Sequence, residues 1–340
     1  MKSKILVAVS GGVDSTYSIC KLLEDYEVIG ITFKICNNIN NLNTIQDAKN
    51  VCDKLNVKHI VEDYTKEFNE NVLNYFVNSY KNGLTPNPCV MCNKYIKFGV
   101  LYESMLKYGC DYLATGHYVR LDKDFNLIKS LEKNKDQTYF VSQVKSEIFK
   151  KCIFPLGNVK SKDSVRKYLE EKGFKNFSKK DSQEICFIDN NNYISFLKEY
   201  IPNKKGIILD DNNNILGYHD GIFNFTIGQR KRLNISSNKR LFVSNINSKD
   251  NSITVSDEDK LYTDTIIKTN INILNKNYLD KKLKCKVRYS SSEIEIDNII
   301  KDSEYYIIKL KEKQKNISPG QYLVAYYDDY VIFSGEIISK

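Results

Sequence analysis

Several residue types are absent or scarce in this sequence. It has no tryptophan, and its 340 residues include only 3 histidines, 3 methionines and 5 prolines. The absence of tryptophan accompanies heavy use of Asn, Lys and Ile, and we interpret it as a compositional bias without functional weight. The three histidines, His59, His117 and His219, are scattered along the chain. They therefore offer no nearby pair of the kind that completes a structural zinc site.

Long hydrophobic runs are also absent. No stretch approaches the roughly 20 apolar residues that a membrane-spanning helix needs. The N-terminal sequence MKSKILVAVSGG contains a short apolar run that ends in glycines, and it lacks the cleavage site of a signal peptide. These features predict a cytoplasmic protein without a membrane association.

Cysteine, by contrast, occurs nine times. In a reducing cytoplasm, cysteines are expected to be thiols, metal ligands or catalytic groups rather than structural disulfides. The composition, 41% hydrophobic and 27% charged, is that of an ordinary soluble protein, and the length of 340 residues predicts two or three domains. The formal net charge of +9 suits a polyanionic partner, although a solvated lysine-rich surface produces the same charge.

The first part of the chain alternates strand and helix patterns. Short strand-like runs are separated by segments in which apolar residues recur at spacings of three and four, as they do on one face of a helix. This order predicts an α/β domain over residues 1–202, with a doubly wound, Rossmann-like parallel sheet. The expected strands are 5–9, 28–35, 58–63 and 112–115, and the expected helices are 14–25, 44–55 and 66–82.

The pattern changes after a linker at residues 202–206. From there, short β-type runs are separated by turns rich in Asn, Asp and Gly. They predict a small central β domain over 203–263 and a C-terminal β-barrel over 264–340. The expected strands include 206–209, 241–246, 253–255, 266–272, 284–288, 294–300, 305–310 and 322–327.

The sequence SGGVDS at residues 10–15 lies between the first expected strand and the first expected helix. Its glycines let backbone amides curl around phosphate oxygens, Ser10 and Ser15 add hydroxyl donors, and the helix offers its positive end. Asp14 would repel a bare phosphate, so it indicates a bridging divalent cation. The loop lacks the Gly-Lys-Ser/Thr ending of a Walker A motif and resembles the SGGxDS loop of the ATP pyrophosphatases. An ordinary strand-to-helix turn is the alternative.

A second distinctive segment, TPNPCVMCN, covers residues 85–93. Its prolines stiffen the chain before a helix that we expect to begin near Asn93. Cys92 would then lie at the helix N-terminus, where the helix dipole lowers a thiol pKa and favours a thiolate that can accept and deliver sulfur. Another cysteine, Cys186, follows in the sequence DSQEICF at 181–187.

Five motifs occur in one order: the SGGVDS loop, NPCVMCN, ATGHY at 114–118, DSQEICF and FTIGQR at 225–230. Together with Pro-Gly-Gln at 319–321 they span nearly the whole chain. In this arrangement the sequence closely resembles the tRNA-specific 2-thiouridylase family, which belongs with the ATP pyrophosphatases. The resemblance implies ATP-dependent adenylation of the wobble uridine of tRNAs for Lys, Glu and Gln, followed by sulfur transfer from a cysteine persulfide.

The resemblance also implies a role for each matching position. Cys92 is expected to be the nucleophile that receives persulfide sulfur and attacks the activated uridine, and Cys186 the partner that carries a persulfide or resolves the link by forming a disulfide with Cys92. The implied ATP-binding positions are Ala8, Val9, Ser10, Gly11, Gly12, Val13, Asp14, Ser15, Phe33 and Gly116. The implied tRNA-binding positions are Asn87, Pro88, Cys89, His117, Lys135, Asp136, Gln137, Arg288, Tyr289 and Gln321.

The implied cofactors are ATP and Mg²⁺, the latter held through Asp14, and the implied partners are tRNA and a sulfur-carrier protein or cysteine desulfurase. We expect a monomer. One position departs from the pattern, because part of the family carries Asp, a proposed acid/base, where this chain has Cys89. A thiol there is a weaker candidate for that role.

Two metal alternatives stay open for the cysteines. Cys89 and Cys92 have the spacing of zinc ligands, but no second such pair follows. An iron–sulfur cluster on Cys89, Cys92 and Cys186 would leave one iron open to bind sulfur. Two functional alternatives also remain: another adenylating ligase or amidotransferase with the same loop, and a non-catalytic RNA-binding module.

Basic residues gather in two regions that suit contacts with RNA phosphates. For any single lysine, a solvated surface remains the simpler interpretation. The first region comprises Lys145, Lys150, Lys151, Lys160, Lys162, Arg166 and Lys167, and the second comprises Gln229, Arg230, Lys231 and Arg232.

Overall fold

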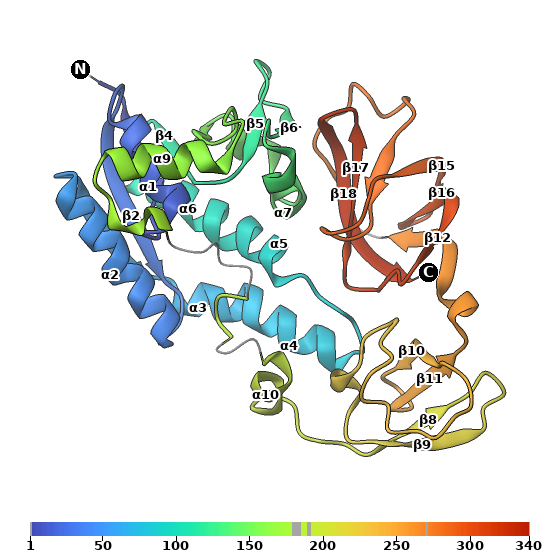
Figure 1. Ribbon diagram of the computed structural model, residues 1–340. Helices are drawn as coiled ribbons and strands as arrows, with labels where there is room; N and C mark the ends of the chain where they lie inside the picture. The colour runs from blue at the N-terminus through green and yellow to red at the C-terminus, as the bar shows by residue number, and fades with distance from the viewer. Residues whose placement is uncertain (1, 179–184, 189–191, 269–270, 340) are drawn as a thin grey trace.

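The structure is a computed structural model that describes residues 2–339 except 179–184, 189–191 and 269–270. Figure 1 shows three parts: a first domain of strands and helices in blue to green, a small β domain in yellow and orange, and a second β domain in orange to red. The second β domain lies beside helices α5 (Pro88–Cys92) and α7 (Thr138–Val141) of the first domain.

The first domain is built on a parallel sheet with the strand order β3-β2-β1-β4-β7. Every neighbouring pair in this sheet is parallel, which confirms the doubly wound architecture that the sequence predicts. The strands are β1 (Lys4–Ala8), β2 (Glu27–Lys34), β3 (Lys58–Asp63), β4 (Tyr112–Ala114) and β7 (Cys152–Ile153).

Helices cover both faces of the sheet because side chains alternate along its strands. On β1, Ile5 and Val7 pack with buried residues of α1 (Val13–Leu22), α2 (Ile39–Lys54) and α9 (Lys162–Glu171). Leu6, on the opposite face, belongs to a core that also contains residues of α5 and of the C-terminal domain. The first domain and the C-terminal domain therefore share one hydrophobic core.

Two long helices of the first domain each contain a π-helical segment. One runs as α3 (Thr65–Phe68), η1 (Asn69–Leu73) and α4 (Asn74–Lys81). The other runs as α5, η2 (Asn93–Val100) and α6 (Leu101–Lys107). The expectation that the second helix begins near Asn93 is wrong, because it begins at Pro88. Proline fits the first turn of a helix, where its missing N–H costs nothing.

The central domain contains a sheet with the strand order β10-β11-β8-β9, in which only β11 and β8 are parallel. It packs around its own buried cluster, which includes Ile208, Val243 and Ile253. Its strands are β8 (Gly206–Leu209), β9 (Ile215–His219), β10 (Phe242–Asn247) and β11 (Ser252–Ser256).

The C-terminal domain is a closed β-barrel, as expected, because β12 pairs with both β16 and β18. A hairpin of the first domain, β5 (Val119–Leu121) and β6 (Leu127–Lys129), extends the barrel sheet through the pair Ile128 and Tyr330. Neither this hairpin nor the last strand, β18, was expected from the sequence. The barrel strands are β12 (Tyr262–Lys268), β13 (Asn272–Ile273), β14 (Lys284–Lys286), β15 (Ile294–Asp302), β16 (Tyr305–Lys315), β17 (Tyr322–Tyr327) and β18 (Tyr330–Ser339).

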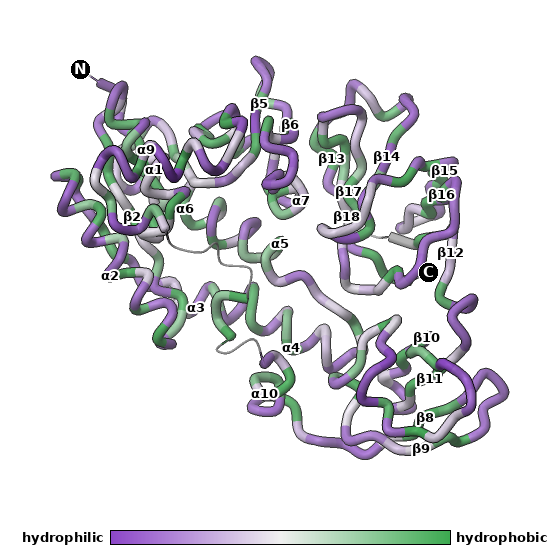
Figure 2. Tube along the Cα trace, in the orientation of Figure 1, coloured by the Kyte–Doolittle hydropathy of each residue, from purple (hydrophilic) through white to green (hydrophobic). Residues whose placement is uncertain are grey.

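Hydrophobic and hydrophilic residues alternate over short distances along the chain, as Figure 2 shows. Among the described residues, no helix has the length and apolar character needed to cross a membrane. The domain boundaries at 202/203 and 263/264 stay predictions. The short helical elements are α8 (Ser146–Phe149), α10 (Tyr193–Lys198), η3 (Lys133–Lys135), η4 (Lys175–Ser178), η6 (Ile222–Asn224) and η7 (Glu258–Leu261).

Candidate active site

The SGGVDS loop connects β1 to α1 at the carboxyl edge of the parallel sheet, where ligands bind in doubly wound folds. Gly11 has a φ of +67°, and a Cβ atom there would lie 2.4 Å from the Cβ atom of Asp47, so only glycine fits. The hydroxyl oxygens of Ser10 and Ser15 lie 3.2 Å apart. The backbone N–H of Ser10 also donates a hydrogen bond to the Ser15 hydroxyl oxygen. These hydrogen bonds between Ser10 and Ser15 join the two ends of the loop.

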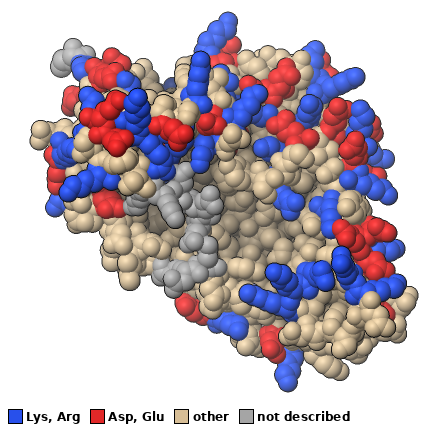
Figure 3. Space-filling view, in the orientation of Figure 1, with Lys and Arg blue, Asp and Glu red and all other residues tan. Residues whose placement is uncertain are grey.

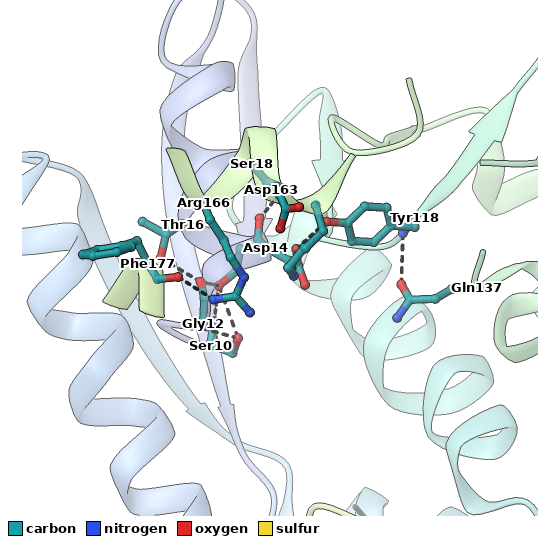
Figure 4. Close-up of polar contacts among 12 residues, drawn as sticks. Ser10, Gly12, Asp14, Thr16, Ser18, Tyr118, Gln137, Asp163, Arg166 and Phe177 are labelled. Atoms are coloured by element: carbon teal, nitrogen blue, oxygen red, sulfur yellow. Dashed lines mark hydrogen bonds and ion pairs between the residues drawn. The ribbon is translucent and has the colours of Figure 1, made fainter. Parts of the chain in front are cut away.

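Asp14 is the charged group of this loop, and Figure 4 shows it between Tyr118 on one side and the Ser10 and Gly12 backbone on the other. Its Oδ1 atom accepts hydrogen bonds from the Tyr118 hydroxyl at 2.8 Å and from the Lys162 ammonium at 2.5 Å. Lys162 is buried. Lys162 was expected only as part of a basic surface region, and the divalent cation expected at Asp14 stays a prediction.

A short segment after α9 holds the far side of the loop. The side-chain amide of Asn176 donates to the Gly11 carbonyl and to the Thr16 hydroxyl, both at 2.8 Å. Arg166 donates to the carbonyl of Phe177 (Figure 4). Neither Asn176 nor this use of Arg166 was anticipated, because no motif marks them. Most of the DSQEICF motif, residues 181–184, lies outside the described residues.

The remaining positions of the implied ATP site surround the loop. Ala8 and Val9 lead into it, and the carbonyl of Val9 accepts from the Thr32 hydroxyl at 2.7 Å. Phe33, at the end of β2, is half-buried and packs edge-to-face on Tyr64 with ring centroids 5.3 Å apart. The loop after β4 touches the nucleotide loop directly: a Cβ atom on Gly116 would lie 3.0 Å from backbone atoms of Asp14 and Ser15.

Cys89, Cys92 and Cys186 influence one another electrostatically although nearly one hundred residues separate the pair from the third. All nine cysteines are free thiols. Cys92 and Cys89 each raise the pKa of Cys186, so the three sulfurs lie within range of each other's charge. Cys36 also belongs to this group, because Asn38 accepts from its thiol at 3.2 Å and donates to the Cys186 carbonyl at 3.4 Å.

The dipole argument for a thiolate at Cys92 is wrong in this structure. Cys92 is buried inside the helix rather than at its N-terminus, and this burial raises its pKa to about 11. The surrounding protein likewise raises the pKa of Cys186 to about 12 and that of Cys89, although both side chains keep an exposed surface. All three thiols are therefore protonated at neutral pH unless a nearby positive charge compensates.

That positive charge is Lys97, which the sequence analysis missed. Its ammonium lowers the pKa of Cys92, Cys89 and Cys186. Lys97 lies in the π-helical segment η2, five residues after Cys92. The hydrogen bonds of a π-helix join residues five apart and so bring them onto one face, as an α-helix does for residues four apart. Spacing that assumes an α-helix does not place Lys97 beside Cys92.

His117 connects the two halves of the site. It follows Gly116, which touches the nucleotide loop, and its ring packs on Phe98 with centroids 5.4 Å apart. Its Nδ1 atom lies 2.7 Å from the Thr115 hydroxyl. Burial, assisted by the charge of Lys97, holds the pKa of His117 well below its usual range. The imidazole of His117 is therefore neutral and buried at neutral pH.

The positions implied to contact tRNA differ in exposure. Asp136 is buried and accepts from the Ser130 N–H and the Thr138 hydroxyl, and Gln137 accepts from the Tyr118 N–H at 2.9 Å. Arg288 and Tyr289 are exposed on the barrel. Tyr289 packs on Phe140 with ring centroids 4.3 Å apart, so the 288–289 segment meets α7, the helix that follows residues 135–137.

The other implied tRNA positions lie along the cysteine segment. Asn87 is half-buried and Pro88 is buried beneath the exposed Cys89. The side-chain amide of Gln321, on the barrel, donates to the Thr85 carbonyl at 2.8 Å. Gln321 therefore lies next to this segment, although the two are 236 residues apart.

The described residues offer no suitable set of ligands for either the zinc site or the iron–sulfur cluster. Within residues 2–339, apart from the undescribed segments, no group of three or more His, Cys, Asp or Glu side chains is placed so that it can hold a metal ion.

The parallel sheet and the nucleotide loop at its carboxyl edge define the class of α/β nucleotide-binding domain that adenylating enzymes use. A family model described as the tRNA methyl transferase HUP domain matches residues 3–190. Models described as the tRNA methyl transferase PRC-barrel domain and the aminomethyltransferase beta-barrel domain match residues 194–257 and 263–337.

Relatives with curated names match over the whole chain. The tRNA-specific 2-thiouridylase MnmA of Caldicellulosiruptor saccharolyticus is 38% identical over 360 residues, covering 100% of this chain and 99% of its own. The tRNA-specific 2-thiouridylase MnmA 1 of Fusobacterium nucleatum is 40% identical and covers 99% of this chain and 93% of its own. The MnmA protein of Clostridioides difficile is 36% identical over 361 residues, covering 100% of this chain and 99% of its own. The chain belongs to the tRNA-specific 2-thiouridylase family.

Proposed function

We propose that this protein is a tRNA-specific 2-thiouridylase that adenylates the wobble uridine of tRNAs for Lys, Glu and Gln and replaces its 2-oxygen with sulfur. The observation that carries the proposal is that Cys92, Cys186 and Lys97 influence one another's charge in a chain that also carries a loop suited to ATP phosphates. A nucleotide loop alone suits any adenylating ligase. Only an enzyme that moves sulfur needs paired thiols there.

In the first step, ATP binds at residues 10–15 with its phosphates against the loop and the N-terminus of α1. Asp14 would supply the oxygen ligand that Mg²⁺ prefers, and Lys162 would add a positive charge for the phosphates. The uridine 2-oxygen attacks the α-phosphorus and the proton on N3 is lost. The bond to the β-phosphate breaks, and pyrophosphate leaves with the electron pair.

In the second step, a persulfide on Cys92 attacks carbon 2 of the adenylated base through its terminal sulfur. The carbon–oxygen bond breaks, and AMP leaves with its electron pair. The Cys186 thiolate then attacks the sulfur of Cys92, so that a Cys92–Cys186 disulfide forms. The electron pair of the broken sulfur–sulfur bond moves to the sulfur on carbon 2, and N3 regains a proton.

Two neighbouring groups have defined tasks in this scheme. Lys97 stabilises each sulfur anion, because its charge opposes the effect of burial on the thiols. Cys89, which replaces the expected carboxylate, has a raised pKa. It is therefore protonated at neutral pH and suits the role of a proton donor better than that of a base.

The tRNA is expected to contact the first domain, the barrel and the central domain. Arg288, Tyr289 and Lys135 provide exposed or half-exposed groups at the first-domain–barrel junction. A cavity of about 210 Å³ in the central domain has a polar, basic lining that suits a phosphate group. Figure 3 shows lysines and arginines along the edge of a hollow, largely uncharged face. The lining of the cavity includes Arg230, Arg232, Lys239 and Arg240.

Three further parts of the proposal concern the cellular setting. The sulfur donor is a carrier protein or a cysteine desulfurase, which must reach the exposed Cys89 side of the cluster. The protein acts as a monomer in the cytoplasm. Its units are residues 1–202, 203–263 and 264–340.

The deciding experiment compares wild-type protein with Cys92→Ser. Each is purified without oxygen and incubated with Mg-ATP, a persulfide donor and unmodified tRNA, and pyrophosphate, AMP and the thiolated nucleoside are measured. We expect the variant to retain tRNA-dependent pyrophosphate release and to lose 2-thiouridine. Undiminished 2-thiouridine in Cys92→Ser would overturn the role of Cys92, and ATP turnover in the wild type without any 2-thiouridine would favour a different adenylating ligase. Absence of ATP turnover in the wild type would favour a non-catalytic RNA-binding module.

A further inference from the structure

The turn between β16 and β17 lies against the segment that carries the paired cysteines. The backbone N–H of Thr85 donates to the Pro319 carbonyl at 2.8 Å. The side-chain amide of Gln321 donates to the Thr85 carbonyl, also at 2.8 Å. Both backbone hydrogen-bonding groups of Thr85 are thus bonded to the barrel.

The turn packs closely against Thr85 and against α4 (Asn74–Lys81). Gly320 has a φ of +92°, and a Cβ atom there would lie 3.0 Å from the Thr85 backbone. On its other side, the Tyr75 hydroxyl lies 3.4 Å from the Gly320 carbonyl and 3.3 Å from the Glu336 carboxylate, toward which it donates. Burial raises the pKa of Glu336. The turn is therefore enclosed between α4 and the cysteine segment.

A second contact from the same strand reaches the other end of the segment. The Tyr322 hydroxyl donates to the sulfur of Met91 at 3.2 Å, and Tyr322 is buried. Met91 lies between Cys89 and Cys92, and the prolines at 86 and 88 stiffen the chain that leads to them. The barrel consequently holds the cysteine segment at two points six residues apart.

We propose that residues 319–322 of the barrel position the cysteines for sulfur transfer, with Gln321 as the positioning residue that acts through Thr85. This inference rests on the proposed function, because that function assigns the cysteines to catalysis. It changes the role that the family resemblance implies for Gln321, from a contact with tRNA to a support of the reactive segment. Reacting groups tolerate little displacement: an error of 1 Å can reduce a rate by about 100-fold.

The test compares Gln321→Ala and the isosteric Gln321→Glu, which removes the N–H donor, with Gln314→Ala as the matched control. Gln314 also lies on the barrel, and its amide donates only weakly, at 3.4 Å, to the carbonyl of nearby Glu312. Three quantities are measured: the single-turnover rate of tRNA thiolation, tRNA affinity, and the rate at which iodoacetamide alkylates Cys89 and Cys92 without tRNA. We expect both Gln321 variants to lose about tenfold or more in thiolation rate. The alkylation rates of Cys89 and Cys92 in these variants should differ from those of the wild type. Their affinity for tRNA should equal that of the wild type.

Gly320→Ala provides an independent variant, because it disturbs the same contact without altering Gln321. It should change alkylation in the same way, and circular dichroism confirms that the variant is folded. Weaker tRNA binding with unchanged alkylation in the Gln321 variants would overturn the proposal in favour of a tRNA contact. If the wild type fails to thiolate tRNA, the proposed function fails, yet the alkylation rates still decide whether the barrel positions the cysteines.

Discussion

The ammonium nitrogen of Lys162 lies 2.5 Å from the Oδ1 atom of Asp14, in the loop that begins the chain's first helix. Lys162 is the first residue of α9, and its side chain is only 9% exposed. The pair brings a buried positive charge to a loop whose backbone already suits phosphate. We expect Lys162 to exchange the carboxylate for phosphate oxygens when Mg-ATP binds at the proposed site.

Replacing Lys162 with Met should weaken the use of ATP. The variant loses a charge-assisted hydrogen bond, which contributes about 1.5–3 kcal/mol, so kcat/KM for ATP should fall by about 10- to 100-fold. Release of pyrophosphate at increasing ATP concentration measures this effect. Lys167→Met is the control, because Lys167 lies on the same helix with a side chain that is 77% exposed. Equal ATP dependence in the two variants would refute the assignment.

Gly11→Ala should prevent phosphate binding at the loop of residues 10–15. An alanine at a φ of +67° costs about 1–2 kcal/mol in backbone energy, and its Cβ atom would also collide with Asp47. Gly109→Ala isolates the first cost, because Gly109 has a φ of +63° and no atom within 4 Å of the added Cβ. Urea unfolding should show a larger loss for Gly11→Ala, and calorimetry should show that only this variant fails to bind ATP. Identical behaviour of the two variants would contradict the prediction.

The sequence predicts the sheet and the nucleotide loop well, because both follow from local patterns. The order of strands and helices indicates the parallel sheet, and the SGGVDS loop has a composition that phosphate binding explains. Lys162 and Asn176 escape prediction because they reach the loop through tertiary packing and belong to no motif. Lys97 escapes because the π-helical winding of η2 changes which residues share a face with Cys92.

The domain organisation is harder to predict from the sequence, because it also depends on tertiary packing. The hairpin β5–β6 consists of two strands of three residues, too short for a periodic pattern, yet it extends the barrel sheet. The contact between Gln321 and Thr85 spans 236 residues of sequence. Family resemblance implies a tRNA contact at Gln321, and only the packed structure reveals the partner on the cysteine segment.

Glu62 should be the carboxylate whose protonation most affects the acid stability of the first domain. Burial opposes its charge, but hydrogen bonds from Lys107, Tyr108, Tyr64 and Ser104 outweigh burial and lower its pKa to about 2. Because the folded-state pKa lies below the unfolded value, its stabilisation is present above about pH 4.5 and disappears as the pH falls toward 2.

Glu62→Gln should therefore reduce the free energy of unfolding at pH 7 by at most about 3 kcal/mol, the free-energy equivalent of this lowered pKa. The difference from the wild type should shrink as the pH falls from 5 to 3. Urea titrations at several pH values measure this. Glu24→Gln is the control, since Glu24 forms an exposed ion pair with Lys21 that should contribute less than about 1 kcal/mol. A constant difference at every pH would show that Glu62 acts through packing alone.

Lys97 should control the reactivity of the cysteines. Burial raises the pKa of Cys92 to about 11, and the Lys97 ammonium counteracts this rise. Lys97→Met removes the opposing charge, so the pKa of Cys92 should rise further and less thiolate should exist at any pH below it.

The rate of Cys92 alkylation by iodoacetamide, followed by mass spectrometry from pH 7 to 10, should move to higher pH in Lys97→Met. Because only the thiolate reacts, the alkylation rate at a given pH falls about tenfold for every tenfold drop in the thiol's acid dissociation constant. Lys97→Arg keeps the charge and should restore most of the reactivity. Lys94→Met, in the same π-helical segment, is the control, because Lys94 lies over the ring of Tyr95 and is not among the groups that alter the pKa of Cys92. An unchanged pH profile in Lys97→Met would mean that the thiols are activated by a group other than this lysine.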